Sequence, residues 1–179
     1  MEIELCRVHD TTSDKYKQME KLLTIAFPKD EYRELAELRI LTEHNHKFHN
    51  NLIYENGKFI GLITYWDFES FFYIEHFAII PEMRNHGYGK MVMEKVKNVL
   101  RRPIVLEVEY PLENMSRRRI GFYERQGFKL LSSEYMQPPY RPGEDFLKLK
   151  IMTYGNIDEN EDFEKVKRII YKEVYKYEP

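Results

Sequence analysis

The sequence predicts an α+β (α/β) protein with a central mixed, mostly antiparallel sheet that helices flank. Residues 52–66 are typical of a hairpin, because Asn56-Gly57 supplies the two positive-φ positions of a type I′ turn. An apolar run over 71–80 is followed by a glycine loop, a helix over about 87–101 and a strand over 104–109. A strand–helix–strand connection indicates parallel neighbours, so the fourth and fifth strands should form one parallel pair in the sheet.

The other elements follow from the same patterns of apolar residues. A helix should begin at the cluster Thr11-Thr12-Ser13-Asp14 and end before Pro28, and a C-terminal helix should bury an apolar face that includes Phe163 and Ile170. Further elements are expected as a strand over 2–8, a helix over roughly 30–43 and a last pair of strands within 128–154.

Length and composition favour one compact domain. We expect a domain over residues 1–154, then an acidic linker and a helix over 155–179 that packs on the domain or on a second subunit of a homodimer. A net charge of −2 gives no basic face for nucleic acid. No run approaches the roughly 20 apolar residues of a membrane span, and the acidic, alternating N-terminus does not resemble a signal peptide. With Cys6 as the only cysteine, the cytoplasm is the expected location.

Three histidines lie within six residues, at His44, His46 and His49. Imidazoles can bind zinc, but no cysteine lies nearby and no other clear ligand follows. A solvated loop is therefore the better interpretation, and no metal site is predicted.

The loop after the apolar run is typical of an anion site. The unpaired N–H groups of a helix N-terminus point outward, and the helix dipole adds positive potential there. Gly87 and Gly89 lack a Cβ, which lets a diphosphate approach the backbone, and Arg84 and Lys90 flank the loop. A plain strand-to-helix turn is the alternative interpretation.

Two motifs resemble those of the GCN5-related N-acetyltransferase (GNAT) family. The spacing Arg84-x-x-Gly87-x-Gly89, directly after Ala-Ile-Ile-Pro, is similar to the family's acetyl-CoA signature. The segment from Ser116 to Phe128 is similar to the family's closing helix, with Ser116 in place of the usual asparagine and Arg119 in place of a small residue.

The resemblance implies a GNAT-like domain in which parallel strands four and five splay to admit the pantetheine arm of acetyl-CoA, or coenzyme A. It implies contacts to the cofactor from three regions: the main chain of the fourth strand, the glycine loop and the closing helix. The residues concerned are Phe77, Ala78, Ile79, Arg84, Asn85, His86, Gly87, Tyr88, Gly89, Lys90 and Ser116.

Acetyl transfer to an amine needs a base for the amine and an acid for the departing thiolate. Tyr123 lies where the family's general acid lies, and a core tyrosine is the alternative. Glu107 and Glu75 are equal candidates for the base, acting directly or through water, although either carboxylate could instead bind a cation. His76 alternates onto the other face of its strand, so we expect it to be packed.

The predicted function is acetyl-CoA-dependent transfer of an acetyl group to a primary amine of a small molecule or peptide. The alternative is a non-catalytic acyl-CoA-binding sensor or interaction module. The sequence does not identify the acceptor amine.

Overall fold

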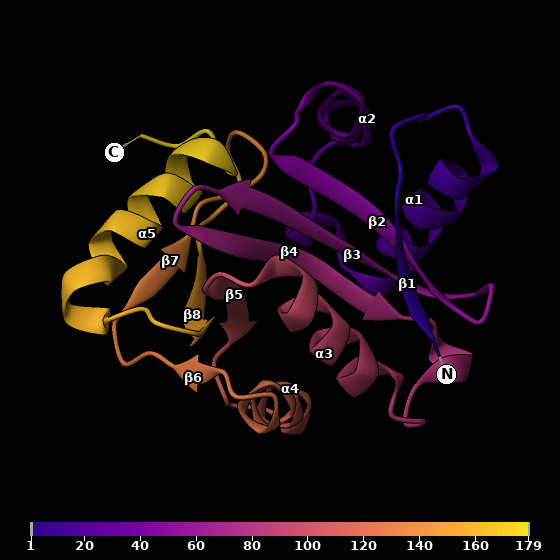
Figure 1. Cartoon of the computed structure of the whole chain (residues 1–179). Helices are drawn as coiled ribbons and strands as arrows, with labels where there is room; N and C mark the ends of the chain where they lie inside the picture. The colour runs from indigo at the N-terminus through magenta and orange to yellow at the C-terminus, as the bar shows by residue number, and fades with distance from the viewer. Residues whose placement is uncertain (1, 179) are drawn as a thin grey trace. The chain divides into compact units, whose positions relative to one another are not determined.

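The computed structural model describes residues 2–178 (Figure 1). The chain consists of two compact units, one that ends at Arg101 and one that begins at Arg102.

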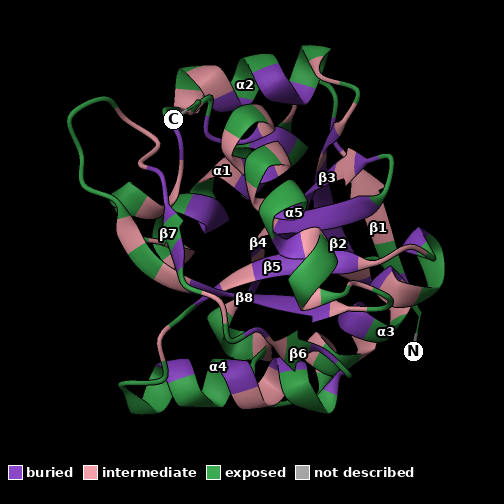
Figure 2. Cartoon of the chain, turned by 90° about the vertical axis from the view of Figure 1, so that its left-hand side faces the viewer, coloured by how far each residue is buried: buried purple, intermediate pink, exposed green. Residues whose placement is uncertain are grey.

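The first unit contains a four-stranded antiparallel sheet in the order β1-β2-β3-β4. The predicted hairpin joins β2 to β3 through Asn56 (φ 47°) and Gly57 (φ 79°), both in the left-handed region that a type I′ turn requires. Most residues of these strands are buried, as the purple ribbon in Figure 2 shows. The strands are β1 (Ile3–Arg7), β2 (Phe48–Glu55), β3 (Lys58–Phe68) and β4 (Phe71–Ile79).

Two amphipathic helices of this unit pack on the sheet. Helix α1 (Asp14–Ala26) begins after the N-cap Ser13, whose Oγ accepts a hydrogen bond from the Tyr16 amide, and it packs against β2, β3 and β4. Helix α3 (Tyr88–Leu100) packs against β1 and β4. The buried residues of α3 recur at helical spacing, namely Val92, Met93, Val96 and Leu100.

The helix predicted over 30–43 is wrong at its start. Residues Lys29–Glu31 form a single 3-10 turn, and helix α2 runs over Leu35–His44. The backbone of Tyr32 is extended (φ −142°), which interrupts the helix. The side chain of the next residue, Arg33, is buried, with 2% of it exposed. The helix begins late because Arg33 has a partner in β4 that local periodicity does not reveal.

The three histidines do not share a solvated loop. His44 is the last residue of α2, whereas His49 lies in β2 and stacks on Tyr65 with ring centroids 4.6 Å apart. Burial, with a smaller contribution from Arg7, lowers the pKa of His49 to about 4. Among residues 2–178 no cluster of three or more His, Cys, Asp or Glu side chains could hold a metal ion.

The second unit contains β5 (Ile104–Glu109), which pairs antiparallel with β8 (Leu147–Tyr154). Two short strands pair with β8 in the same antiparallel sense, β6 (Lys129–Leu130) and β7 (Tyr135–Gln137). Helix α4 (Asn114–Arg125) packs against β5 and β6.

The C-terminal helix α5 (Glu159–Glu173) packs within this second unit. Its apolar stripe of Phe163, Val166 and Ile170 is buried, as expected from the helical spacing of these residues. Near its N-terminal end the Glu159 carboxylate accepts a hydrogen bond from the Ser133 amide at 2.6 Å. Near its C-terminal end the Tyr171 hydroxyl donates to the Met136 carbonyl. The division at residues 154/155 stays a prediction, as does a second subunit.

Candidate functional site

The predicted anion loop is an exposed segment between β4 and α3. A 3-10 turn (Pro81–Met83) ends β4, and residues 84–87 are exposed. Gly87 caps α3 in the left-handed region (φ 82°), and a Cβ added there would meet no atom within 4 Å. The first helical hydrogen bond runs from the Met91 amide to the Gly87 carbonyl, so the amides of residues 88–90 precede it. The loop therefore offers backbone donors beside open space, as an anion site requires.

Arg84 fixes the loop to the end of β4. Its Nε donates to the Ile79 carbonyl at 2.9 Å. Lys90 lies in the first turn of α3, with its Nζ 3.7 Å from Glu94, and both side chains are more than half exposed. The predicted cationic neighbours of the loop therefore differ: Arg84 stabilises the backbone, while Lys90 extends into solvent.

The predicted cofactor strand, Phe77 to Ile79, lies at the C-terminal end of β4. On one edge it pairs with β3, where Gly61 lies opposite Ile79. A Cβ at Gly61 would lie 2.3 Å from the Ala78 carbonyl oxygen, so glycine is required for this close approach. The strand backbone is thereby held in a fixed register next to the anion loop.

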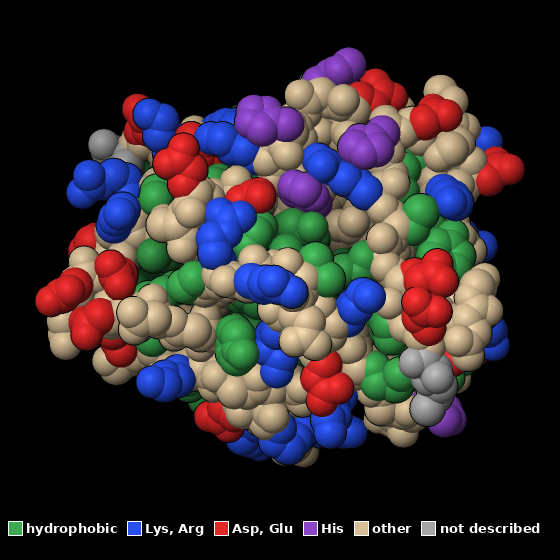
Figure 3. Space-filling view, viewed as in Figure 1, with side chains coloured by type: hydrophobic (Ala, Val, Ile, Leu, Met, Phe, Trp, Pro, Cys, Tyr) green, Lys and Arg blue, Asp and Glu red, His purple; other side chains and the backbone are tan. Residues whose placement is uncertain are grey.

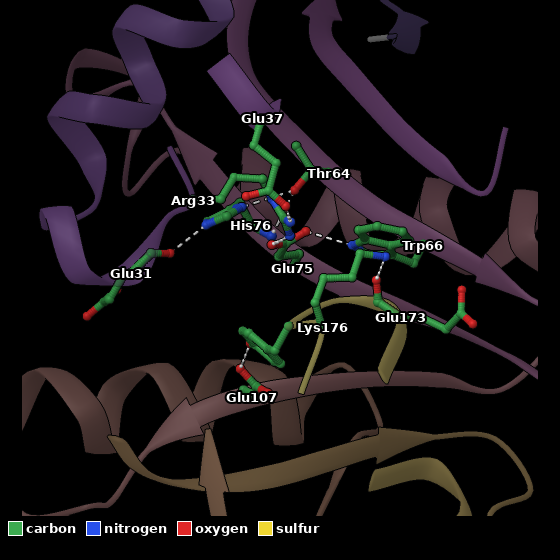
Figure 4. A network of polar contacts seen from close by, with 11 residues as sticks. Glu31, Arg33, Glu37, Thr64, Trp66, Glu75, His76, Glu107, Glu173 and Lys176 are labelled. Carbon is green, nitrogen blue, oxygen red and sulfur yellow. Dashed lines mark hydrogen bonds and ion pairs between the residues drawn. The ribbon is translucent and has the colours of Figure 1, made fainter. Parts of the chain in front are cut away.

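Glu75 is buried in an ion pair. Thr64 pairs with His76 and Tyr65 with Ile74, so Glu75 is the extra residue of a β-bulge and simple alternation does not assign its face. Its Oε1 lies 2.5 Å from Nη2 of Arg33, and its Oε2 accepts from Trp66 Nε1 at 2.7 Å. The side chains of Arg33 and Glu75 are 2% and 1% exposed. Figure 4 shows this network, in which Glu37 contacts the other terminal nitrogen of Arg33 at 3.1 Å.

His76 is packed, as predicted. Its ring is buried, with Nδ1 3.2 Å from the Thr64 hydroxyl and Nε2 2.8 Å from the Glu31 carbonyl (Figure 4). Phe27 meets the ring edge-on at 4.8 Å. Burial lowers the pKa of His76, which keeps the imidazole neutral and suits a structural role.

Glu107 lies on β5 and is the other candidate base. Its Oε2 accepts from the Tyr175 hydroxyl at 2.8 Å, and its Oε1 accepts from the Tyr135 hydroxyl. The neighbouring carboxylate on the same strand, Glu109, is instead 2.9 Å from Arg119 in a half-exposed pair. The two carboxylates of β5 therefore differ: tyrosines hold one, and an arginine holds the other.

Tyr123 lies on the buried face of α4. It contacts Phe122 and Phe128 edge-on, with centroids 5.1 and 5.4 Å away. Burial raises the pKa of Tyr123 to about 12, so the phenol is protonated at physiological pH. Within residues 2–178 its hydroxyl makes no hydrogen bond. It remains able to donate to another group.

Ser116, the first residue of the segment that resembles the family's closing helix, does not begin that helix. Helix α4 begins at Asn114, with Glu113 as its N-cap and Ser116 one turn inside it. The Ser116 hydroxyl accepts from the Glu113 amide at 3.1 Å and donates to the Glu113 carbonyl at 2.9 Å, as part of a capping box. These two bonds use the hydroxyl proton and one lone pair of Ser116, so a contact to a cofactor would have the remaining lone pair as its acceptor.

Sequence reasoning missed the partners of the two glutamates. Arg33 and Trp66 bind Glu75 from 42 and 9 residues away, and Tyr135 and Tyr175 bind Glu107 from 28 and 68 residues away. None of these four belongs to a recognisable motif. The high tyrosine content, 14 residues, was the only signal for the second pair.

On the face of the molecule in Figure 3, acidic and basic side chains are interspersed and form no large patch of a single charge. None of the helices within residues 2–178 has the length and apolar character needed to cross a membrane.

Comparison with known proteins identifies the family. Residues 16–128 match the profile of the acetyltransferase (GNAT) family. A solved structure from Bacteroides thetaiotaomicron, whose name assigns it to the GNAT family of acetyltransferases, is 46% identical. It aligns over 99% of this chain and 100% of its own, with a TM-score of 0.94. No curated protein matches the chain.

More distant structures share the fold. The ribosomal-protein-S18-alanine N-acetyltransferase of Escherichia coli is 19% identical and aligns over 89% of this chain and 98% of its own (TM-score 0.59). An aminoglycoside 6′-N-acetyltransferase complexed with coenzyme A is 14% identical over 88% of this chain and 100% of its own (TM-score 0.62). The predicted class, an α+β GNAT-like domain with a mixed sheet and a C-terminal helix, is confirmed. The chain belongs to the GNAT family of acetyl-CoA-dependent N-acetyltransferases.

Proposed function

We propose that this chain transfers an acetyl group directly from acetyl-CoA to a primary amine of a small molecule or peptide. The observation that carries the proposal is the open anion loop at residues 84–89, where Gly87 and the N-terminus of α3 present backbone amides to open space. The aminoglycoside acetyltransferase of the same fold is complexed with coenzyme A, which supports this ligand.

The residues of the loop fit a diphosphate. The amides near Gly87 and Gly89 would hold it, with Asn85, His86, Tyr88 and Lys90 around it and Arg84 holding the loop on β4. The main chain of residues 77–79 would hold the pantetheine arm. The bound molecule supplies the thioester that is to be cleaved.

The base in this proposal is Glu107, which takes the proton of the acceptor ammonium directly or through one water. Glu75 is the weaker candidate because its carboxylate neutralises the buried Arg33, whereas Glu107 accepts hydrogen bonds from two neutral tyrosine hydroxyls. If Glu75 took up a proton, the buried Arg33 would lose its closest counter-charge.

The acid is Tyr123, whose hydroxyl is protonated at neutral pH and has no hydrogen-bond partner within residues 2–178. It donates to the sulfur as negative charge develops there.

The test is thiol release from acetyl-CoA with a panel that contains an alkylamine, a polyamine, an amino-acid amide, a peptide N-terminus and an aminoglycoside. We expect at least one amine to be acetylated. Glu107→Gln should then lower kcat/KM by about 10²–10⁴-fold with coenzyme A affinity retained. Glu109→Gln is the matched control, because Glu109 lies on the same strand and pairs with Arg119.

Coenzyme A binding without thiol release for any amine would contradict the proposal and favour the alternative function, a non-catalytic acyl-CoA-binding sensor or interaction module.

A cytoplasmic location belongs to the same proposal and is supported by the free thiol of Cys6, the only cysteine. A homodimer remains part of the proposal and is tested by the molar mass in solution.

A further inference from the structure

Glu107 is a carboxylate that tyrosines hold on both oxygens. The Tyr175 hydroxyl donates to Oε2 at 2.8 Å, and the Tyr135 hydroxyl donates to Oε1. Both rings are buried, with 8% and 1% of the residue exposed. A carboxylate with one donor on each oxygen has little rotational freedom, and each bond favours its charged form.

The two donors come from the part of the chain that follows the family profile. The profile ends at residue 128, whereas Tyr135 lies on β7 and Tyr175 lies just after α5. Packing fixes both rings: Tyr135 meets Tyr171 at 5.8 Å, and Tyr175 meets Tyr140 at 5.0 Å. The segment after α5 therefore contains one donor, Tyr175, and Tyr171 of α5 packs against the other donor, Tyr135.

Tyr135 is suited to be a permanent donor. Burial and the adjacent Glu107 carboxylate raise the pKa of Tyr135 well above its ordinary value, so its proton stays on the phenol. Burial also raises the pKa of Tyr171, whose hydroxyl donates to the Met136 carbonyl. Tyr171 thus belongs to the same aromatic cluster but has a different acceptor.

We propose that Tyr135 and Tyr175 are positioning residues for Glu107, which they hold in one orientation and keep ionised as the base of acetyl transfer. The inference rests on the proposed function for its catalytic meaning. It makes the C-terminal segment, through Tyr175, a part of the catalytic apparatus.

The other ionisable groups on the elements around Glu107 have partners of their own. Glu109 pairs with Arg119, and the buried Lys150 on β8 donates to the Ser132 and Ser133 carbonyls at 2.6 and 3.2 Å. Beside Tyr175, Lys176 donates to the Glu173 carbonyl at 2.9 Å. Two tyrosine hydroxyls of the second unit thus face the Glu107 carboxylate, and the rings of Tyr171 and Tyr140 pack against these tyrosines.

The direct test is a carbon-13 NMR titration of the full-length protein labelled at the glutamate side-chain carboxyl. The resonance of Glu107 is the one missing from Glu107→Gln. In Tyr175→Phe, which keeps the ring and removes the hydroxyl, we expect its titration midpoint to rise by about one pH unit. Tyr135→Phe should act in the same direction. Tyr171→Phe, the matched control four residues earlier in the last turn of α5, should leave the midpoint unchanged.

The second readout is the pH dependence of kcat/KM for the amine that the panel identifies. Its acid limb should move to higher pH in Tyr175→Phe and stay in place in Tyr171→Phe. An unchanged Glu107 midpoint in both Tyr175→Phe and Tyr135→Phe, or an unchanged acid limb, would overturn the proposal. A wild-type protein that acetylates no amine would refute the proposed function instead, and the NMR titration would still decide whether the tyrosines keep Glu107 ionised.

Discussion

Replacement of Glu75 by glutamine should destabilise the protein strongly. Glutamine keeps the size of the side chain but removes the charge that faces Arg33, and both side chains are at most 2% exposed. Loss of one partner of a buried ion pair destabilises by about 3–5 kcal/mol, because the remaining charge has no water around it. Arg33 keeps Glu37 at 3.1 Å, and the amide oxygen can still accept from Trp66, so we expect the lower end, about 3 kcal/mol.

The assay is urea unfolding of wild type and Glu75→Gln, followed by tryptophan fluorescence, because Trp66 lies in the network itself. The midpoint should fall without a change in the slope against urea. In a thermal scan 3 kcal/mol corresponds to a fall of roughly 6–12 °C.

The matched control is Asp14→Asn, which removes an ion pair with Lys17 at 3.0 Å whose side chains are 68% and 98% exposed. Exposed pairs contribute about 0–1 kcal/mol, so this variant should unfold almost as wild type does. Equal stability of Glu75→Gln and wild type would refute the structural role of Glu75 and restore it as an equal candidate for the base.

Two further predictions concern proton chemistry. Tyr123→Phe should lower kcat by about 10²–10⁴-fold with coenzyme A affinity retained, measured by thiol release and calorimetry; full activity at all pH values would mean that solvent protonates the thiolate. In the folded protein the pKa of His49 is about 4, below its ordinary value of 6.5. As the pH falls, His49 is therefore protonated in the unfolded chain before it is protonated in the folded protein. The free energy of unfolding should decrease as the pH falls from 6.5 to 4. Since His49 is only half-buried, we expect about 1–2 kcal/mol from it. Urea unfolding of His49→Phe, which keeps a ring against Tyr65, should show a correspondingly flatter pH dependence, and identical profiles would exclude this contribution.

Most helices and strands could be predicted from the sequence, because each of them depends on residues that are neighbours along the chain. The hairpin at Asn56-Gly57 depends on two positive-φ positions, and α3 on an apolar stripe. The start of α2 could not be predicted this way, because Arg33 leaves the helical register to reach Glu75, 42 residues away. The bulge at Glu75 also reverses the alternation on which a face assignment depends.

In the candidate site, too, contiguous motifs could be predicted from the sequence, whereas contacts between distant segments could not. The anion loop is a contiguous motif with its own backbone geometry, so Gly87 and the start of α3 are found from sequence alone. The roles of Glu75 and Glu107 depend on partners that fold against them from distant segments, as Tyr175 does from 68 residues away. Spacing carries no information about such contacts.

The anion loop itself is tested most directly by calorimetric titration of coenzyme A into wild type, Gly87→Asp and Gly57→Asp. Both glycines have positive φ and open space at the Cβ position, and both lie in the first unit, so the two variants add the same charge and similar backbone strain. Aspartate tolerates this backbone region better than most residues, and at residue 87 its carboxylate would repel a diphosphate. We predict that Gly87→Asp weakens coenzyme A binding by at least about tenfold, or 1.4 kcal/mol, while Gly57→Asp binds as wild type does. Equal affinity of all three proteins would contradict the assignment of the diphosphate to residues 84–89.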